Sequence, residues 1–195
     1  ILVKLKTYKE YKPLFEDASF LILQSEEISD KFEGKPIHIN VTNVKERIEP
    51  QGGESVGNVM QRNVDAVLAQ REKTGIPMFP HINHPNFFYT VTVQDLIDLR
   101  GERFFEVYNG HPMVNNYGDS LRPGTEQMWD IINVAYSAKN QPLMYGLATD
   151  DSHDYHQIGS ANSNSGRGWV MVYADSLSPS ALISAMENGD FYAST

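Results

Sequence analysis

Residues 143–156 read LMYGLATDDSHDYH, an apolar run of strand length that ends abruptly in a cluster of ionisable side chains. The cluster contains Asp150, Asp151, His153, Asp154 and His156. Holding five such groups together at the end of a buried strand costs free energy unless they have a partner. A divalent metal ion is one such partner, because carboxylate oxygen and imidazole nitrogen are both good ligands. A solvated polar loop after a strand is the alternative.

The composition indicates a single globular domain over residues 1–195. Hydrophobic residues make up 41% of the chain and charged residues 21%, which is enough apolar material for a core. The net charge of −9 and the lack of a Lys/Arg cluster argue against a nucleic-acid partner. No apolar run approaches the roughly 20 residues that span a bilayer. Because cysteine is absent, disulfides and thiolate ligands are excluded. Compartment and oligomeric state stay open.

Strand-like and helix-like segments alternate along the chain. The expected strands cover residues 20–24, 34–44, 77–82, 104–108, 143–148 and 169–174, and another begins at 191. The expected helices cover residues 55–73, 92–99, 125–138 and 181–188, from amphipathic spacing and capping residues. This alternation predicts a parallel α/β architecture, and six or seven strands favour a barrel over a sandwich.

Polar side chains recur where the expected strands end. Glu27, His84, His111 and Asp151 each follow a strand, whereas His38 lies early in its own strand. Barrels of alternating strands and helices build their active sites at the carboxyl ends of the strands. The six histidines all lie within or just after expected strands: His38, His81, His84, His111, His153 and His156. We therefore expect a metal-centred site at this end of the fold.

Five segments carry a resemblance to a known family. They are SEEIS (25–29), HINVTN (38–43), NHPNF (83–87), FFEVYNGHP (104–112) and TDDSH (149–153). In order and type, this set resembles the motifs of the PHP (polymerase and histidinol phosphatase) superfamily of metal-dependent phosphoesterases. The resemblance implies a distorted, TIM-like (β/α)7 barrel that binds up to three divalent metals.

The resemblance also implies roles for five residues. Glu27 matches a glutamate that bridges two metals, and His38 and His84 match histidines that bind one of these. Asp151 matches a ligand of the neighbouring metal, and His153 matches a ligand of a third. Glu27 and Asp151 are thereby also the candidate catalytic residues. Histidine and carboxylate ligands without cysteine suit zinc, manganese or iron.

One part of the family pattern is missing before Glu27. The family opens with a His-x-His pair, followed by an aspartate and a further histidine on the next strand. Because Ile1 is an implausible start, we expect the domain to be incomplete at its N-terminus, and this chain to hold one or two metals. A degenerate domain is the alternative.

Further polar residues are candidates for binding substrate or supporting the ligands: His81, Glu106, Asn109, His111 and Arg167. Arg167 could clamp a phosphate bidentately or form a structural salt bridge. Asn109 and Gly110 could instead form a plain turn, and His81 could pack beside the site.

Three acidic or imidazole side chains near the predicted ligands are expected to do something other than ligation. Glu26 should face the opposite side of the strand from Glu27. Asp150 is expected to support Asp151, and His156 to lie on the surface.

The predicted function is a metal-dependent phosphoesterase that hydrolyses a small phosphorylated substrate with a metal-activated hydroxide. Activated water is not selective for phosphorus, so a hydrolase of an amide or lactone bond is a second hypothesis. A metal-binding sensor domain without full chemistry is the third.

Overall fold

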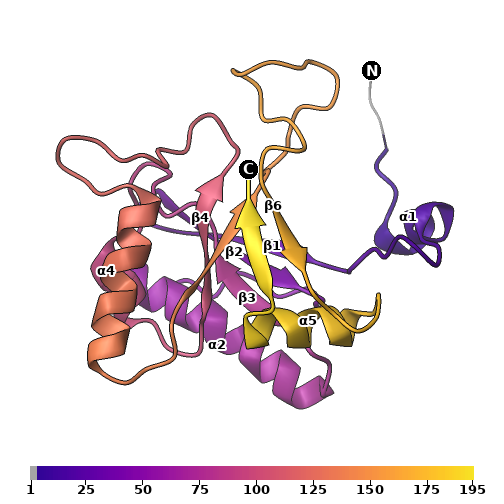
Figure 1. Ribbon diagram of the computed structural model, residues 1–195, viewed down its shortest axis with the longest axis horizontal. Helices are drawn as coiled ribbons and strands as arrows, with labels where there is room; N and C mark the ends of the chain where they lie inside the picture. Colours follow the sequence, from indigo (N-terminus) through magenta and orange to yellow (C-terminus); the bar gives the residue numbers. More distant parts are fainter. Residues whose placement is uncertain (1–3) are drawn as a thin grey trace.

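The computed structural model describes residues 4–195 (Figure 1). Its elements, in chain order, are α1 (Tyr8–Phe15), β1 (Glu26–Phe32), β2 (Lys35–Thr42), α2 (Val56–Thr74), β3 (Phe79–Ile82), α3 (Val93–Asp98), β4 (Phe104–Asn109), α4 (Thr125–Ala138), β5 (Tyr145–Thr149), β6 (Trp169–Val172), α5 (Pro179–Asn188) and β7 (Phe191–Ser194). The expectation about Ile1 concerns a residue outside the described range.

The strands form two sheets. Five of them make a mixed sheet in the order β1-β2-β3-β4-β5, and β6 pairs with β7. The β1/β2 and β2/β3 pairs are antiparallel, whereas β3/β4 and β4/β5 are parallel. The predicted (β/α)7 barrel is therefore wrong: over residues 4–195 the larger sheet stays open at β1 and β5. A barrel of that kind needs parallel neighbours joined by crossovers, and β1 and β2 are joined by a tight hairpin turn instead.

The β1–β2 hairpin turns at Glu33 and Gly34. Both have positive φ, 49° and 80°, and they lie between the paired residues Phe32 and Lys35. This is the backbone pattern of a two-residue type I′ turn, whose twist matches that of the flanking strands. The turn fixes a register in which Glu27 lies opposite Asn40.

The expected strand at residues 20–24 is displaced in the structure. Phe20 makes only an isolated bridge to Asp17, and the paired strand begins at Glu26. The register ends with Glu26 opposite Val41, and beyond it Asn43 has a φ of 64° that turns the chain out of β2. Within residues 4–195, the segment before Glu26 therefore has no partner strand, and Glu27 lies near the start of a strand, not after its end.

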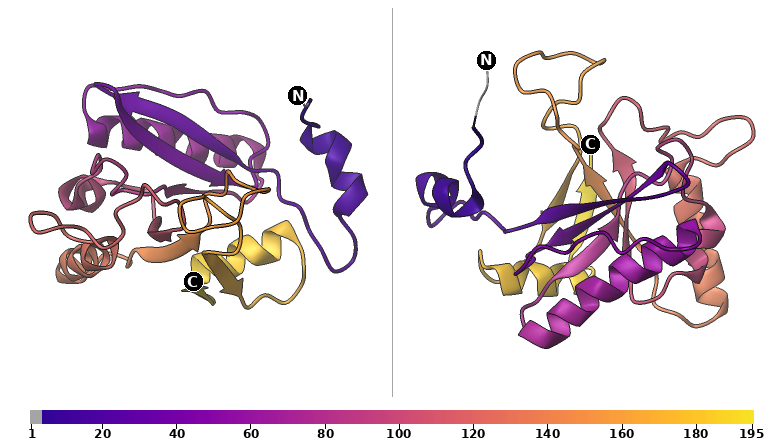
Figure 2. Two further views of the ribbon diagram at one scale, coloured as in Figure 1. Left: turned by 90° about the horizontal axis from the view of Figure 1, so that it is seen from above. Right: turned by 180° about the vertical axis from the view of Figure 1, so that it is seen from behind.

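The helices α2, α3 and α4 cover one face of the five-stranded sheet, as the view from behind shows (Figure 2). Their apolar side chains pack on strand residues that include Ile39, Ile82 and Phe105. The other face is partly covered by α5 and the β6–β7 sheet, through a cluster built on Phe79 and Phe104. Because side chains alternate along a strand, the residues between the core positions point away from α2–α4.

All four helices expected from local signals are found, α3 among them with Thr92 as its N-cap. In α2, the Ser55 side chain accepts a hydrogen bond from the Asn58 N–H, and Gly75 ends the helix at a φ of 66°. The predicted bounds of α4 are confirmed, and α5 begins after the N-cap Ser178. Within the described range, no helix has both the length and the apolar character needed to cross a membrane.

Candidate metal centre

Three side chains of metal-binding type converge on the face of the sheet opposite α2–α4. Nδ1 of His38 lies 3.2 Å from Oε1 of Glu27 and 3.2 Å from Nε2 of His84. Each residue offers one ligand atom, and the three atoms all lie within 4.8 Å of one another. Glu27, His38 and His84 therefore form a group that could hold a metal ion.

The spacing of these atoms fits a coordination shell. In a tetrahedral site with metal–nitrogen bonds of about 2.0–2.1 Å, neighbouring ligand atoms lie roughly 3.3–3.4 Å apart. The two 3.2 Å separations at His38 are close to that value. Burial lowers the pKa of His38, with His84 adding to the effect and Glu27 opposing it. The lowered pKa favours the neutral imidazole, which is the form that binds a metal.

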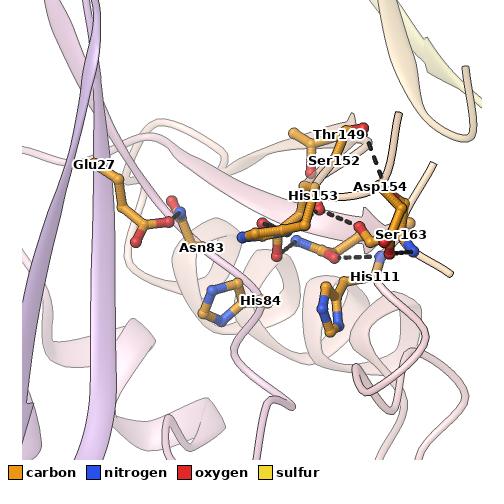
Figure 3. Close-up of polar contacts among 12 residues, drawn as sticks. Glu27, Asn83, His84, His111, Thr149, Ser152, His153, Asp154 and Ser163 are labelled. Atoms are coloured by element: carbon orange, nitrogen blue, oxygen red, sulfur yellow. Dashed lines mark hydrogen bonds and ion pairs between the residues drawn. The ribbon is translucent and has the colours of Figure 1, made fainter. Parts of the chain in front are cut away.

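The hairpin register brings Glu27 and His38 together. Glu27 is opposite Asn40, so His38, two residues earlier on β2, is its diagonal neighbour on the same face. The carboxylate is held by Ser29 Oγ, which donates to Oε1 at 2.8 Å, and by Asn83 Nδ2, which donates to Oε2 at 2.9 Å. Figure 3 shows this carboxylate beside Asn83, with His84 and His153 nearby.

His84 is supplied by the turn that follows β3. Its side chain is buried, with 6% exposed, and its backbone has a φ of 22°. Positive φ is uncommon outside glycine, and such positions persist only where the surroundings hold them. Here the backbone N–H of His84 donates to Oε2 of Glu106 at 2.7 Å, and its ring packs edge-on against Phe87.

Glu106 connects several parts of the site. Only 2% of it is exposed, and its Oε2 also accepts from Asn109 Nδ2 at 2.8 Å, while Oε1 accepts from Thr149 Oγ1 at 2.8 Å. Burial favours the neutral acid, but His81 and His84 outweigh it and lower the pKa of Glu106. The carboxylate is therefore ionised at neutral pH, as the donors around it require.

Asp151 and His153 lie at the same cavity but outside the three-ligand group. The cavity has a volume of about 130 Å³ and is lined by Glu27, His38, His84, Phe87, His111, Asp151 and His153. Asp151 has a φ of 47°, and its Oδ2 accepts from Asn109 Nδ2 at 3.2 Å. The side chain of His153 is 65% exposed. All five predicted ligands thus face one small space, and three of them are close enough to share an ion.

His81 packs beside the site, which was the alternative to its contacting a ligand or substrate. It is buried and lies beside the site: its Nε2 is 3.5 Å from Oε1 of Glu106, and neither ring nitrogen has a hydrogen-bond partner among the described residues. Asn109 is more than part of a plain turn, since its amide joins Glu106 to Asp151.

Other predicted residues are used to hold loops. The Arg167 guanidinium donates to the carbonyl oxygens of Gly110 at 3.1 Å and Gly159 at 2.6 Å, and it forms no salt bridge among the described residues, so the phosphate clamp stays a prediction. Asp150 accepts backbone N–H groups from residues 166–168 and does not contact Asp151 through its carboxylate. His156 is exposed.

Glu26 faces away from Glu27, as the alternation of the strand predicts. Its Oε1 accepts the backbone N–H of Ile48 at 2.7 Å, which ties β1 to the segment that follows β2. The two adjacent glutamates therefore have separate tasks, one structural and one at the candidate metal centre.

Two residues of the site carry no ligand-type signal and were not predicted. Asn83 holds Glu27 and also accepts the backbone N–H of Asn40 through Oδ1 at 3.0 Å. Phe87 forms an apolar wall of the cavity. Their place beside the His84-Pro85 pair is the only signal that could have drawn attention to them.

The chain matches no protein-family model, no curated protein and no solved structure. What can be inferred about its function therefore rests on its own residues and their arrangement.

Proposed function

We propose that this protein is a metal-dependent phosphoesterase, similar in its ligand set to the PHP superfamily, and that it hydrolyses a small phosphorylated substrate. The observation that carries the proposal is the convergence of Glu27, His38 and His84 at a cavity that Asp151 and His153 also line. Two histidines and a carboxylate on one ion, with a further carboxylate and histidine beside it, is a donor set suited to zinc, manganese or iron.

When bound, a divalent cation at these residues would act as a Lewis acid that acidifies water and neutralises charge on phosphoryl oxygens. The first ion would be held by Glu27, His38 and His84. Asp151 and His153 are the candidate ligands for a second. We infer one or two ions per chain.

The protein's own residues keep these ligands in place. Asn83 orients the Glu27 carboxylate, and Asn109 orients Asp151. Glu106 holds both His84 and Asn109, so one buried carboxylate aligns ligands that come from β3 and β5. Supporting hydrogen bonds of this kind commonly change metal affinity by about 10- to 100-fold when they are removed.

The size of the cavity and the net charge of the protein bear on the kind of group that could bind. A cavity of about 130 Å³ accommodates a group the size of a phosphoryl. The protein has a net charge of −9, so an anion must be attracted locally and not by the overall field. This balance again argues against a nucleic-acid backbone as the partner.

Metal binding is the first test. Protein stripped with a chelator is titrated with Zn²⁺ and Mn²⁺ in a calorimeter, together with the variants Glu27→Gln and Glu26→Gln. Glu27→Gln should weaken the tightest site by more than about 10-fold. Glu26→Gln is the matched control: it is the adjacent glutamate, it faces away, and it should bind metal like the parent protein. Full retention of metal by Glu27→Gln would refute the shared site.

Hydrolysis is the second test. The metal-loaded protein is assayed with p-nitrophenyl phosphate, bis(p-nitrophenyl) phosphate and p-nitrophenyl acetate. We expect metal-dependent release from a phosphate ester and little from the acetate. Release from the acetate alone would favour the hydrolase of a non-phosphate bond. If the protein binds metal tightly but hydrolyses none of the three compounds, the hypothesis of a metal-binding sensor domain would be favoured.

A further inference from the structure

The rings of His111 and His153 stand next to each other at the cavity. Their centroids are 5.4 Å apart and their planes are nearly perpendicular, at 88° (Figure 3). Both rings line the cavity together with Glu27, His38 and His84. Each ring has its Nδ1 engaged with the backbone, but the direction of the hydrogen bond differs between the two.

His153 is held as a donor at Nδ1. Its Nδ1 lies 2.8 Å from the carbonyl oxygen of Asp151, and a carbonyl oxygen can only accept. The proton of the neutral ring is therefore on Nδ1, and Nε2 keeps its lone pair. A histidine fixed in this way, by an Nδ1–H to a backbone carbonyl, is prepared to bind a cation through Nε2.

His111 is held the opposite way. The backbone N–H of Met113 donates to Nδ1 of His111 at 3.2 Å, so Nδ1 must carry the lone pair. In the neutral ring the proton is then on Nε2.

Several of the other lining groups cannot donate a hydrogen bond to an anion. The carboxylates of Glu27 and Asp151 only accept, Phe87 has no polar atom, and Nδ1 of His38 and Nε2 of His84 face each other at the candidate metal position. Arg167, whose guanidinium would suit a phosphate, does not line the cavity and donates to the backbone carbonyls of Gly110 and Gly159. His111 thus offers an N–H donor at the cavity, which the two carboxylates and Phe87 cannot supply.

We propose that the cavity is divided by the opposite tautomers of these two histidines: His153 offers Nε2 as a lone pair to a cation, and His111 offers Nε2–H to an anionic phosphoryl oxygen. His111 is thus a substrate-binding residue. The choice of a phosphoryl group as the ligand rests on the proposed function, whereas the two tautomers do not.

The tautomers are measurable without any activity. In protein with ¹⁵N-labelled histidine, loaded with diamagnetic Zn²⁺, long-range ¹H–¹⁵N correlation spectra distinguish Nδ1–H from Nε2–H rings. We expect His111 as the Nε2–H form and His153 as the Nδ1–H form. Finding His111 protonated at Nδ1 would overturn the proposal.

Inorganic phosphate is the probe for the anion. Titrated into the zinc-loaded protein, it should shift the Nε2 resonance of His111 in a saturable manner. If it binds elsewhere and leaves His111 unperturbed, the assignment fails. If phosphate perturbs His111 but no phosphate ester is hydrolysed, the anion subsite stands and the proposed phosphoesterase function is what fails.

Two variants separate the donor from the bulk of the ring. In His111→Gln the side-chain amide can place an N–H near the position of Nε2, whereas in His111→Asn it reaches only to the position of Nδ1. We expect the asparagine variant to bind phosphate about 10-fold or more weakly, and the glutamine variant to retain most of the affinity. Both should keep the zinc affinity of the parent protein. Equal phosphate affinity in all three proteins would contradict the role of the N–H.

Discussion

The backbone N–H of His84 and the carboxylate of Glu106 are joined by a 2.7 Å hydrogen bond, although the residues lie on different elements 22 positions apart. Through this contact the buried Glu106 orients His84, a candidate metal ligand. Glutamine has the shape of glutamate, but its NH₂ group replaces one of the two acceptor oxygens and would face a hydrogen-bond donor. Glu106→Gln should therefore lower the free energy of unfolding by about 1–3 kcal/mol and weaken zinc binding by roughly 10- to 100-fold.

Chemical denaturation and calorimetric zinc titration check these two effects of Glu106→Gln. A suitable comparison is Thr149→Val, which removes a single donor to Glu106 and leaves the hydrogen bond to His84 in place. It should have the smaller effect on zinc binding. If Glu106→Gln binds zinc like the parent protein, Glu106 does not position His84.

The turn of the β1–β2 hairpin is expected to be sensitive to the residue types at Glu33 and Gly34. Gly34 has a φ of 80°, and a Cβ there would meet no atom within 4 Å, so backbone strain alone determines the cost of a side chain. Gly34→Ala should destabilise the fold by about 1–2 kcal/mol. Glu33→Asn should stabilise it slightly, because Asn-Gly is the preferred type I′ pair. Thermal unfolding of both variants tests this, and a neutral Gly34→Ala would argue against the turn.

Arg167 should be a structural residue. Its guanidinium joins the loop after β4 to the loop between β5 and β6, through the carbonyl oxygens of Gly110 and Gly159. Arg167→Gln removes both contacts and should cost about 1–3 kcal/mol of stability. Because this side chain does not line the cavity, zinc binding should be unchanged. If Arg167→Gln instead lost phosphate binding and kept its stability, the prediction that Arg167 binds phosphate would be supported.

Glu102 gives the protein a pH-dependent weakness far from the site. It is 4% exposed, its Oε2 has no hydrogen-bond partner among the described residues, and burial raises its pKa well above the ordinary value of 4.5, against donors at Arg103 and Phe104. Above that ordinary value the unfolded chain loses the proton and the folded chain keeps it. The stability that this residue contributes is therefore present at low pH and is lost as pH rises through the raised pKa.

Glu102→Gln cannot ionise, so its stability relative to the parent protein should increase as pH rises from about 4 to about 8. Urea unfolding at several pH values in this range measures the difference. A difference that stays constant with pH would mean that Glu102 is ionised in the folded protein.

Local signals in the sequence were sufficient for several elements. The N-cap Ser55 and the terminal Gly75 bound α2 within a residue or two of the prediction, and α4 lies where its apolar spacing placed it. These features depend on residues a few positions apart, because a helix closes its hydrogen bonds within its own segment. The same local alternation correctly placed Glu26 and Glu27 on opposite faces of their strand.

Strand pairing could not be predicted in this way. The sequence has the alternation of strands and helices expected of a barrel, but the turn at Glu33 and Gly34 makes β1 and β2 antiparallel. The hairpin also places Glu27 near the start of β1, whereas the sequence predicted that it follows a strand at residues 20–24. A two-residue hairpin turn of this type needs two residues with positive φ, and glutamate is not a residue type that favours this conformation.

The sequence by itself determined the ingredients of the site: histidines and carboxylates of metal-binding type, no cysteine, and their position in or next to strands. Only the tertiary structure decided that Glu27, His38 and His84 converge, that Glu106 and Asn109 hold the residues around them, and that Arg167 is used elsewhere. The physical reason is the range of the interactions. Helix bounds follow from neighbours along the chain, whereas a ligand group is assembled by the register between strands, and a shift of one residue would turn His38 to the opposite face.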